Sequence, residues 1–528
     1  MNPRNALSVV IIGAGPAGLT AALLLARQGI AVQVLERRAG TSIHPRARGL
    51  NVRTMEIYRG VGLESTIEQA GAALAASKYM LFVETLAGEE IRRVPDDDLV
   101  ITGDALAAYT PCGWVQCAQD ALEPLLLEQA RQAGAVVHFG SDVRQISQDD
   151  AGVTISVNDV TTHEDTPLHA QYVLAADGAN GHLREDVGIA VIERAVQGHY
   201  VNIYFRADLQ HLVEGREFAL CFVENPTSPG IILAVNNTDR WLFNAEYDPA
   251  TTAIEQFTPE HCFELVRAAV GIADLSVEIL SILPWDATAR YARQMRQGRV
   301  FLLGDAAHTM PPAGGLGLNT GVADAHNLAW KLALVLRGQA TATLLATYEA
   351  ERLPVAQQAV EHAAHELQQG RPDAPPEDGL AATLLPILGF TYASTAIRAD
   401  DATTATDALD LTGRPGTRLP HVWVERAGQR LSTLDLVGDH FVLLVGPEGG
   451  AWQVALKEIP LTIAVDTYQM GGTSTIHDTD RRWCAANGLQ ASGAVLVRPD
   501  GIVAWRAAEA VGSPTTVLAE AINGIVQS

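Results

Sequence analysis

Two glycine-rich segments, one near the N-terminus and one around residue 310, carry residue types whose spacing suits a bound dinucleotide. The first reads Val-Val-Ile-Ile-Gly-Ala-Gly-Pro-Ala-Gly-Leu over residues 9–19. Its apolar, β-branched beginning predicts a buried parallel strand. After that strand, Gly13 permits a tight turn, Gly15 lets the backbone approach a pyrophosphate, and Gly18 lets the following helix pack closely. The pattern predicts the phosphate-binding turn of a nucleotide-binding α/β fold.

The residues after this turn extend the same interpretation. Residues 19–28 predict a helix, and residues 31–35 predict the next strand of a parallel sheet. That strand runs into Glu36-Arg37-Arg38, which places Glu36 at roughly the 20-residue distance expected of the acid that binds a ribose hydroxyl pair. A strand, a glycine fingerprint, a helix, a second strand and an acid in this order are far more specific than the glycines alone.

The second glycine-rich segment combines a carboxylate with the start of a helix. Residues 299–303 predict a buried strand, which runs into Gly304-Asp305, two prolines and a glycine cluster, and a helix is expected from about Asn319. A carboxylate at a strand end can hold a ribityl or ribose hydroxyl. A glycine-rich helix start presents free backbone N–H groups and the positive end of the helix dipole to an anion. Together with the first segment, this indicates one FAD molecule that is bound at both ends.

Further candidate contacts lie between these segments. Residues 40–56 form a basic loop with Pro and Gly that enters a helix, and its arginines are either functional, beside a pyrophosphate or flavin, or simply solvated. Residues 119–132 predict a helix with leucines on one face. Residues 172–180 predict another buried strand, which ends in Asp177-Gly178.

The composition favours an enzyme and excludes some partners. The chain has 528 residues, with 37 basic and 61 acidic side chains and a formal net charge of −24. This charge disfavours nucleic acid and anionic membrane surfaces, because both select basic patches. The five cysteines are scattered without metal-ligand spacing, which predicts free thiols in a reducing cytoplasm and no metal site. No segment approaches the length of about 20 apolar residues that a membrane span needs.

The order of the expected elements predicts an α/β protein in which a Rossmann-like domain is interrupted. Residues 1–184 and 290–370 are assigned to this FAD-binding domain. Residues 185–289 show the alternation of antiparallel strands, which predicts a separate β-sheet domain for the substrate. Residues 371–411, which begin with a Pro- and acid-rich break, are expected to form a linker and a helical segment. Residues 412–528 predict a small, independent α/β domain.

In this order of motifs the chain resembles the class A FAD-dependent aromatic hydroxylases, the para-hydroxybenzoate hydroxylase and phenol hydroxylase-like group. The long form with a C-terminal extension fits best, as in phenol hydroxylase and the polyketide-tailoring hydroxylases of antibiotic biosynthesis. The motifs that carry the resemblance are Gly13-x-Gly15-x-x-Gly18, Asp177-Gly178 followed by Arg184, and Gly304-Asp305. Further matches are Pro45-Arg46-Ala47 with Asn51, Arg53 and Glu56, and Gln119-x-x-Leu122-Glu123. The resemblance covers essentially the whole chain.

The resemblance implies how FAD is held. Glu36 would bind the adenosine ribose, Asp305 the ribityl or ribose side near the pyrophosphate, and Arg46 and Gln119 the flavin. The backbone from Gly315 to Asn319 would face the pyrimidine end of the flavin, whose negative charge in the reduced state a helix N-terminus stabilises. Asp177 would support the site through hydrogen bonds. The expected cofactor residues are Gly13, Gly15, Pro16, Ala17, Gly18, Glu36, Arg37, Arg46, Gln119, Asp177, Gly304, Asp305, Pro312, Gly315, Gly317, Leu318 and Asn319.

The resemblance also implies a monooxygenase reaction in two halves. NADPH or NADH reduces FAD, and O2 then adds to give a flavin hydroperoxide that hydroxylates an electron-rich aromatic, heteroaromatic or polyketide-type molecule. Pro312, in the family's proline pair, and Arg46 are the residues expected at this step. The chain has no second dinucleotide fingerprint, so the nicotinamide is expected to dock transiently. An epoxidase or Baeyer–Villiger-type oxygenase of the same fold, and a non-catalytic flavin-binding relative, are the alternatives.

The substrate pocket is expected against the inserted sheet. Candidate pocket residues in that segment, each of which could also be ordinary core, are Tyr204, Phe222, Phe243 and Trp285. Met310 is a candidate apolar wall because it lies beside the second glycine-rich motif.

The C-terminal domain resembles the thioredoxin-like extension of these hydroxylases. Thiol–disulfide exchange needs a partner thiol, but Cys484 is the only cysteine in this part of the sequence. We therefore expect a structural role for the domain, including a contact in a homodimer.

Overall fold

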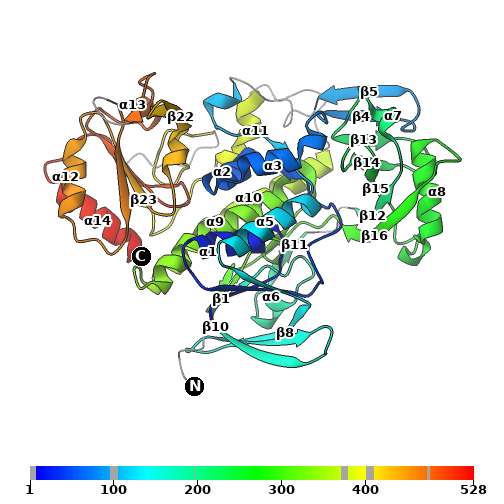
Figure 1. Cartoon of the computed structure of the whole chain (residues 1–528), viewed down its shortest axis with the longest axis horizontal. Coiled ribbons are helices and arrows are strands. Elements are labelled where there is room, and N and C mark those ends of the chain that lie inside the picture. The colour runs from blue at the N-terminus through cyan, green and yellow to red at the C-terminus, as the bar shows by residue number, and fades with distance from the viewer. Residues whose placement is uncertain are drawn as a thin grey trace.

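The computed structural model describes residues 7–95, 105–194, 196, 198–369, 379–399, 409–471 and 476–527. A central α/β unit carries a β-sheet unit at one end and the C-terminal α/β unit at the other (Figure 1). This is the mixed α/β architecture that the sequence predicts. None of the described helices is long and apolar enough to cross a membrane.

The central unit is built on an eight-stranded sheet. Its parallel part follows the order β19 (Val300–Leu302), β10 (Asp165–Ala175), β1 (Leu7–Ile12), β2 (Val32–Glu36) and β7 (Val136–Phe139). Antiparallel pairing adds β18 (Arg296–Gln297), β9 (Val153–Asp159) and β8 (Ser141–Gln148). The strands that follow β1 in the sequence pair on both sides of it. Ligands bind at such a reversal of strand order, in the crevice beyond the carboxyl ends of the strands.

Helices pack on this sheet through small and branched apolar side chains. The helix α1 (Pro16–Arg27) contacts both α5 (Gln119–Gln132) and α9 (Leu316–Leu336), and α9 contacts α10 (Ala346–Gln369). The α1 and α9 helices begin earlier than predicted. Gly314 and Gly315, with φ of 71° and 62°, turn the chain into α9 three residues before Asn319. Shorter helices are α2 (Val52–Gly60), α3 (Glu64–Ala70), α6 (Leu183–Asp186) and α11 (Gly379–Leu388).

The second unit is a seven-stranded sheet, seen edge-on beside α8 in Figure 1. Its order is β16 (Glu278–Asp286), β12 (His199–Arg206), β15 (Arg240–Glu246), β14 (Gly230–Ala234), β13 (Leu220–Val223), β4 (Tyr79–Val83) and β5 (Glu90–Pro95). One face packs on α8 (Pro259–Val270); the small helix α7 (Gln210–Val213) lies between β12 and β13 in the chain. β4 and β5 belong to the range 1–184 that was assigned to the FAD-binding domain, so the range 185–289 does not contain the whole sheet.

The C-terminal unit is centred on a four-stranded sheet in the order β24 (Val465–Gln469), β23 (Phe441–Val445), β26 (Ala494–Val497) and β27 (Val503–Ala507). The helices α12 (Gly450–Glu458) and α14 (Pro514–Val526) pack together beside it, and α13 (Trp483–Ala486) follows β25 (Ile476–His477). β25 pairs with β21 (Trp423–Arg426), which pairs with β22 (Gln429–Ser432). In the predicted linker 371–411, residues 371–378 and 400–408 lie outside the described residues, and α11 occupies part of the rest.

Five further short strands form two small sheets of their own. They are β3 (Gly49–Leu50), β6 (Val115–Gln116), β11 (Val191–Glu193), β17 (Arg290–Ala292) and β20 (His308–Thr309). β3 pairs with β6, which fixes the basic loop before α2 against the segment before α5.

Candidate functional site

The motif residues come together because each follows, or ends, one of four neighbouring parallel strands. Gly13 follows β1, Glu36 ends β2, Asp177 follows β10, and Gly304-Asp305 follow β19. These strands are adjacent in the order β2, β1, β10 and β19. The residues therefore meet at one edge of the sheet, where they line a cavity of about 340 Å³.

Most of the expected cofactor residues line this cavity. They are Gly13, Gly15, Pro16, Ala17, Gly18, Glu36, Arg37, Arg46, Gln119, Asp177, Gly304, Asp305, Gly317 and Leu318. The other three do not line the cavity but lie at the start of α9: Pro312, Gly315 and Asn319. The Asn319 side chain instead ties α9 to the end of the basic loop. Its Oδ1 accepts from the Asn51 N–H at 3.1 Å, and its Nδ2 donates to the Gly49 carbonyl at 3.0 Å.

The turn after β1 leaves room for an anion at one position only. A Cβ on Gly13, whose φ is 108°, would lie 2.1 Å from the carbonyl oxygen of Ala176, and a Cβ on Gly18 would lie 2.1 Å from that of Gly13. These two glycines are needed for the close packing of the turn and helix. A Cβ on Gly15 would meet no atom within 4 Å, because that position faces the cavity. Gly15 also caps α1 without any side-chain hydrogen bond.

A second helix begins at the same cavity. α9 is capped by Gly315, again without a side-chain hydrogen bond, and Gly317 and Gly321 of its first turns line the cavity. A Cβ on Gly321 would lie 3.0 Å from the Cα of Gly304 and 3.2 Å from the Cβ of Ala17. Glycine therefore lets α1, α9 and the turn after β19 meet closely. Two helix N-termini without capping side chains give this cavity a positive potential that suits a pyrophosphate or a reduced flavin.

The acids of the cavity have free acceptor capacity. Asp177 Oδ2 accepts from the Leu183 N–H at 3.2 Å, whereas its buried Oδ1 has no partner among the described residues. Burial raises the pKa of Asp177. Burial also raises the pKa of Asp305, although His308 and Arg46 oppose this rise. A hydroxyl donor from a ligand would satisfy these carboxylates.

The carboxylate of Glu36 is already oriented by the backbone. Its Oε2 accepts from the Ala14 N–H and its Oε1 from the Arg38 N–H, both at 2.9 Å. One carboxylate thereby joins the phosphate-binding turn to the end of β2, as a ribose-binding acid requires.

The basic loop is held against α5 by a buried glutamate. Glu123 Oε2 accepts from the Ser42 N–H, and Glu123 Oε1 accepts from the Gln119 Nε2, both at 2.6 Å. Arg46 extends from this loop to the cavity, and partial burial, together with the nearby Arg38, lowers the pKa of its guanidinium. The turn, the two helix starts, the unpaired carboxylate oxygen and these cations all fit FAD.

One face of the seven-stranded sheet presents a continuous row of side chains. Directly paired positions cross from β16 to β5 in the order Leu283, Asn202, Asn244, Ile231, Phe222, Phe82 and Arg92. Because directly paired residues share a face, we call this set the cross-sheet row. It is polar near β12 and aromatic near β4. There the rings of Phe222 and Phe82 stack at 4.7 Å, and the Arg92 guanidinium lies 4.1 Å from the Phe82 ring centroid.

The polar end of the cross-sheet row touches the loop that carries Arg46. The Nε2–H of His44 donates to Asn202 Oδ1 at 3.0 Å, and the His44 ring lies 5.6 Å from that of Tyr204. Burial and the charge of Arg46 lower the pKa of His44 to about 4, so its ring is neutral at pH 7. Asn244 Oδ1 is buried without a partner among the described residues. Sequence reasoning missed His44, Phe82 and both asparagines.

The predicted substrate residues divide between the two faces of this sheet. Tyr204 and Phe222 lie on the face of the cross-sheet row, and Trp285 pairs with Tyr200 and stacks on it at 4.6 Å. Phe243 lies on the opposite face, fully buried in the core against α8. Phe243 is therefore a core residue of this sheet, on the face opposite the cross-sheet row. Met310 is half-buried beside the start of α9, 3.8 Å from where a Cβ on Gly317 would lie.

Two family models match the chain. Residues 6–363 match the FAD binding domain, and residues 412–527 match the C-terminal domain of aromatic-ring hydroxylases. The chain belongs to the FAD-dependent aromatic-ring hydroxylases. This hydroxylase is therefore a flavin monooxygenase with FAD as cofactor and NAD(P)H as reductant, and the predicted family, fold class and cofactor are confirmed.

Similar proteins cover nearly the whole chain of the hydroxylase. A putative polyketide hydroxylase of Streptomyces halstedii is 41% identical, with 96% of this chain and 94% of the relative covered. The tetracenomycin A2 monooxygenase-dioxygenase of Streptomyces glaucescens is 39% identical, with 94% and 93% covered. The solved structure of aklavinone-11 hydroxylase with FAD and aklavinone superimposes with a TM-score of 0.89 at 37% identity, covering 99% of both chains.

Proposed function

We propose that this hydroxylase uses NAD(P)H and O2 to hydroxylate an aromatic polyketide. The observation that carries the proposal is the cross-sheet row, which changes from polar side chains beside the Arg46 loop to stacked aromatic rings at β4. A fused-ring substrate has the same two properties, because its ring faces are apolar and its rim carries hydroxyl and carbonyl groups. The similarity to a protein named as a putative polyketide hydroxylase supports the same substrate class.

The chain's own residues would bind and orient the reactants. Bound FAD would supply the two-electron transfer from NAD(P)H and the activation of O2. The amides at the start of α1 and the acid Glu36 would hold the dinucleotide, while α9 and Arg46 would stabilise negative charge at the flavin end. We propose that Pro312 lies beside the reacting carbon, as the family resemblance implies.

The substrate would be fixed from the opposite side by the cross-sheet row. Phe222 and Phe82 would stack on its rings. The amide oxygens of Asn202, beside its bond from His44, and of Asn244, which has no partner among the described residues, would accept hydrogen bonds from its rim hydroxyls. The neutral His44 ring would keep Asn202 in place. Apolar contact on one side would also exclude water from the reacting face.

The test is NAD(P)H consumption in air by the FAD-loaded protein, with a panel of fused-ring quinones and naphthacene-type phenols. Single-ring phenols and catechols serve as matched controls. We expect a fused-ring compound to accelerate consumption and to gain one oxygen atom, which 18O2 labelling and mass spectrometry would show. Acceleration by single-ring phenols alone would refute the polyketide assignment. Insertion of oxygen into a carbon–carbon bond, or an epoxide product, would replace hydroxylation by one of the two alternative oxygenations.

A further inference from the structure

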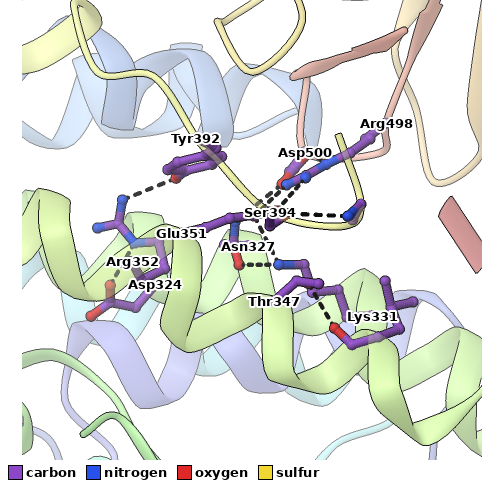
Figure 2. A network of polar contacts seen from close by, with 12 residues as sticks. Asp324, Asn327, Lys331, Thr347, Glu351, Arg352, Tyr392, Ser394, Arg498 and Asp500 are labelled. Atoms are coloured by element: carbon purple, nitrogen blue, oxygen red, sulfur yellow. Dashed lines mark hydrogen bonds and ion pairs between the residues drawn. The ribbon is translucent and has the colours of Figure 1, made fainter. Parts of the chain in front are cut away.

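A buried network of charges joins the C-terminal unit to α9 and α10 (Figure 2). At its centre, Arg498 donates through Nη1 and Nη2 to the two carboxylate oxygens of Glu351, at 2.7 and 2.8 Å. Arg498 Nε also donates to Asp500 Oδ1 at 3.0 Å. Glu351 Oε2 accepts further from Lys331 Nζ at 2.8 Å and from Asn327 Nδ2 at 2.7 Å. The side chains of Arg498, Glu351 and Lys331 are fully buried.

From Arg498 a line of contacts leads to the glycine–aspartate motif of the cavity. The guanidinium of Arg498 lies 5.7 Å from the ring centroid of Tyr392. The Tyr392 hydroxyl accepts from Arg352 Nη1 at 3.0 Å, and Arg352 Nε donates to Asp324 Oδ1 at 2.8 Å. Asp324 Oδ2 then accepts from the backbone N–H of Gly304 at 3.1 Å. We call these four side chains, Arg498, Tyr392, Arg352 and Asp324, the relay.

The relay also fixes the surroundings of Gly304. His308 Nε2 lies 2.8 Å from the same oxygen of Asp324, and Arg352 Nη2 donates to the carbonyl of Thr320 in the first turns of α9 at 3.2 Å. Burial alone would raise the pKa of Asp324, but Arg352 and His308 hold it below its usual value. The carboxylate is therefore charged. It holds Gly304 through the backbone N–H and holds the start of α9 through Arg352, which also donates to Thr320.

The partners of a buried charge are not easily lost. Removing one member of a buried ion pair leaves the other charged and unpaired in a low-dielectric region, which favours rearrangement of its neighbours. None of the described residues of the C-terminal unit lines the cavity, so this unit can act on the cofactor only through such contacts.

We infer that the C-terminal unit is a positioning element of the FAD site, and that Arg498 sets the place of Gly304-Asp305 through Tyr392, Arg352 and Asp324. The four relay members are positioning residues, because none of them touches the cavity. The role requires no cysteine chemistry.

The test separates cofactor affinity from stability with two relay variants and one matched control. Arg498→Met breaks the first contact, while Tyr392→Phe keeps the ring and removes only the oxygen that accepts from Arg352. The control is Arg418→Met. Arg418 is as buried as Arg498 and also comes from the C-terminal unit, but it pairs with Glu56 on α2. Among the described residues, Glu56 also pairs with Arg53, which donates to the backbone carbonyl of Asp500 and has no hydrogen bond to a relay member. FAD affinity is measured by titrating the apoprotein and following flavin fluorescence, and the melting temperature is measured without FAD.

We expect the FAD dissociation constant to rise about tenfold in Arg498→Met and about threefold in Tyr392→Phe. Arg418→Met should lower the melting temperature of the apoprotein but leave the dissociation constant within about twofold. An unchanged dissociation constant in Tyr392→Phe would overturn the inference even if Arg498→Met fails to fold. An equal rise in Arg418→Met would also overturn it, because docking of the unit in general would then be responsible. Substrate turnover is not needed for either readout.

Discussion

Replacing Gly15 by alanine separates the fold of the phosphate-binding turn from its ligand. The backbone of Gly15 has φ −78° and ψ −179°, which alanine adopts freely, and a Cβ there meets no protein atom within 4 Å. Alanine lowers the entropy of the unfolded chain, worth about 0.4–1 kcal/mol, but is a poorer helix cap by a similar amount. The free energy of unfolding of the apoprotein should therefore change by less than about 1 kcal/mol.

The same methyl group projects into the cavity where the pyrophosphate would approach the start of α1. It would separate the phosphate from one or two backbone N–H groups, and each charge-assisted hydrogen bond is worth about 1.5–3 kcal/mol. The FAD dissociation constant of Gly15→Ala should rise at least about tenfold, since 1.4 kcal/mol corresponds to a factor of ten. Isothermal titration of apoprotein with FAD measures this rise, and chemical denaturation measures stability.

Two further glycines serve as controls. Gly512→Ala adds a methyl group at another open position, in the C-terminal unit, and should leave FAD affinity unchanged. Gly18→Ala places its Cβ 2.1 Å from the Gly13 carbonyl and should destabilise the apoprotein itself. Wild-type FAD affinity in Gly15→Ala would refute the reasoning, because the pyrophosphate could not then lie at this turn. A large loss of apoprotein stability in Gly15→Ala would refute the view that the position is open.

Two other predictions concern the sheet and the loop. Phe222→Ala should raise KM for a fused-ring substrate with little loss of stability, whereas Phe243→Ala should lower the free energy of unfolding by about 3–5 kcal/mol. Steady-state kinetics and urea denaturation measure the two effects. A larger rise in KM for Phe243→Ala than for Phe222→Ala would contradict the assignment of the two residues to opposite faces. The pKa of His44 is about 4 in the folded protein and about 6.5 in the unfolded chain, so on acidification the unfolded chain binds the proton first. This part of the free energy of unfolding is therefore fully present above pH 6.5, and about 3 kcal/mol of it is lost as the pH falls to 4. His44→Gln should remove this part of the acid sensitivity between pH 7 and pH 4.5, and an unchanged slope of stability against pH would show that the ring is not held neutral.

Local patterns were sufficient to predict that the motif residues converge on one cavity. Gly13, Glu36 and Gly304 each stand directly after an apolar run, and strands in a parallel sheet end at the same edge, so their convergence follows from the order of elements. The substrate side could not be predicted in the same way. Alternation along β13 and β15 separates Phe222 from Phe243, but both faces of this sheet carry apolar side chains, so the pattern does not tell which face meets the pocket.

The relay and its neighbours were invisible in the sequence for a different reason. Lys331, Glu351 and Arg352 lie on amphipathic helices, where charged side chains are typical of a solvated surface. The partners that bury these charges come from the neighbouring helix and, for Glu351, from Arg498, 147 residues away. Arg53 and Glu56 were matched to the family's basic loop, yet Glu56 pairs with Arg418, 362 residues away. Pairing across such distances leaves no periodic signal in one sequence.

The parallel pairing of β4 with β13 sets a rule for exchanging parts between relatives. A chimera that receives only residues 185–289 from another hydroxylase would place a foreign β13 against the resident β4, so that Phe222 and Phe82 would come from different parents. The segment to be exchanged is therefore discontinuous, and residues 79–95 have to be taken from the same parent as residues 185–289. A single crossover at position 184 divides the seven-stranded sheet between two parents, whereas exchanging both segments together keeps its strands from one parent.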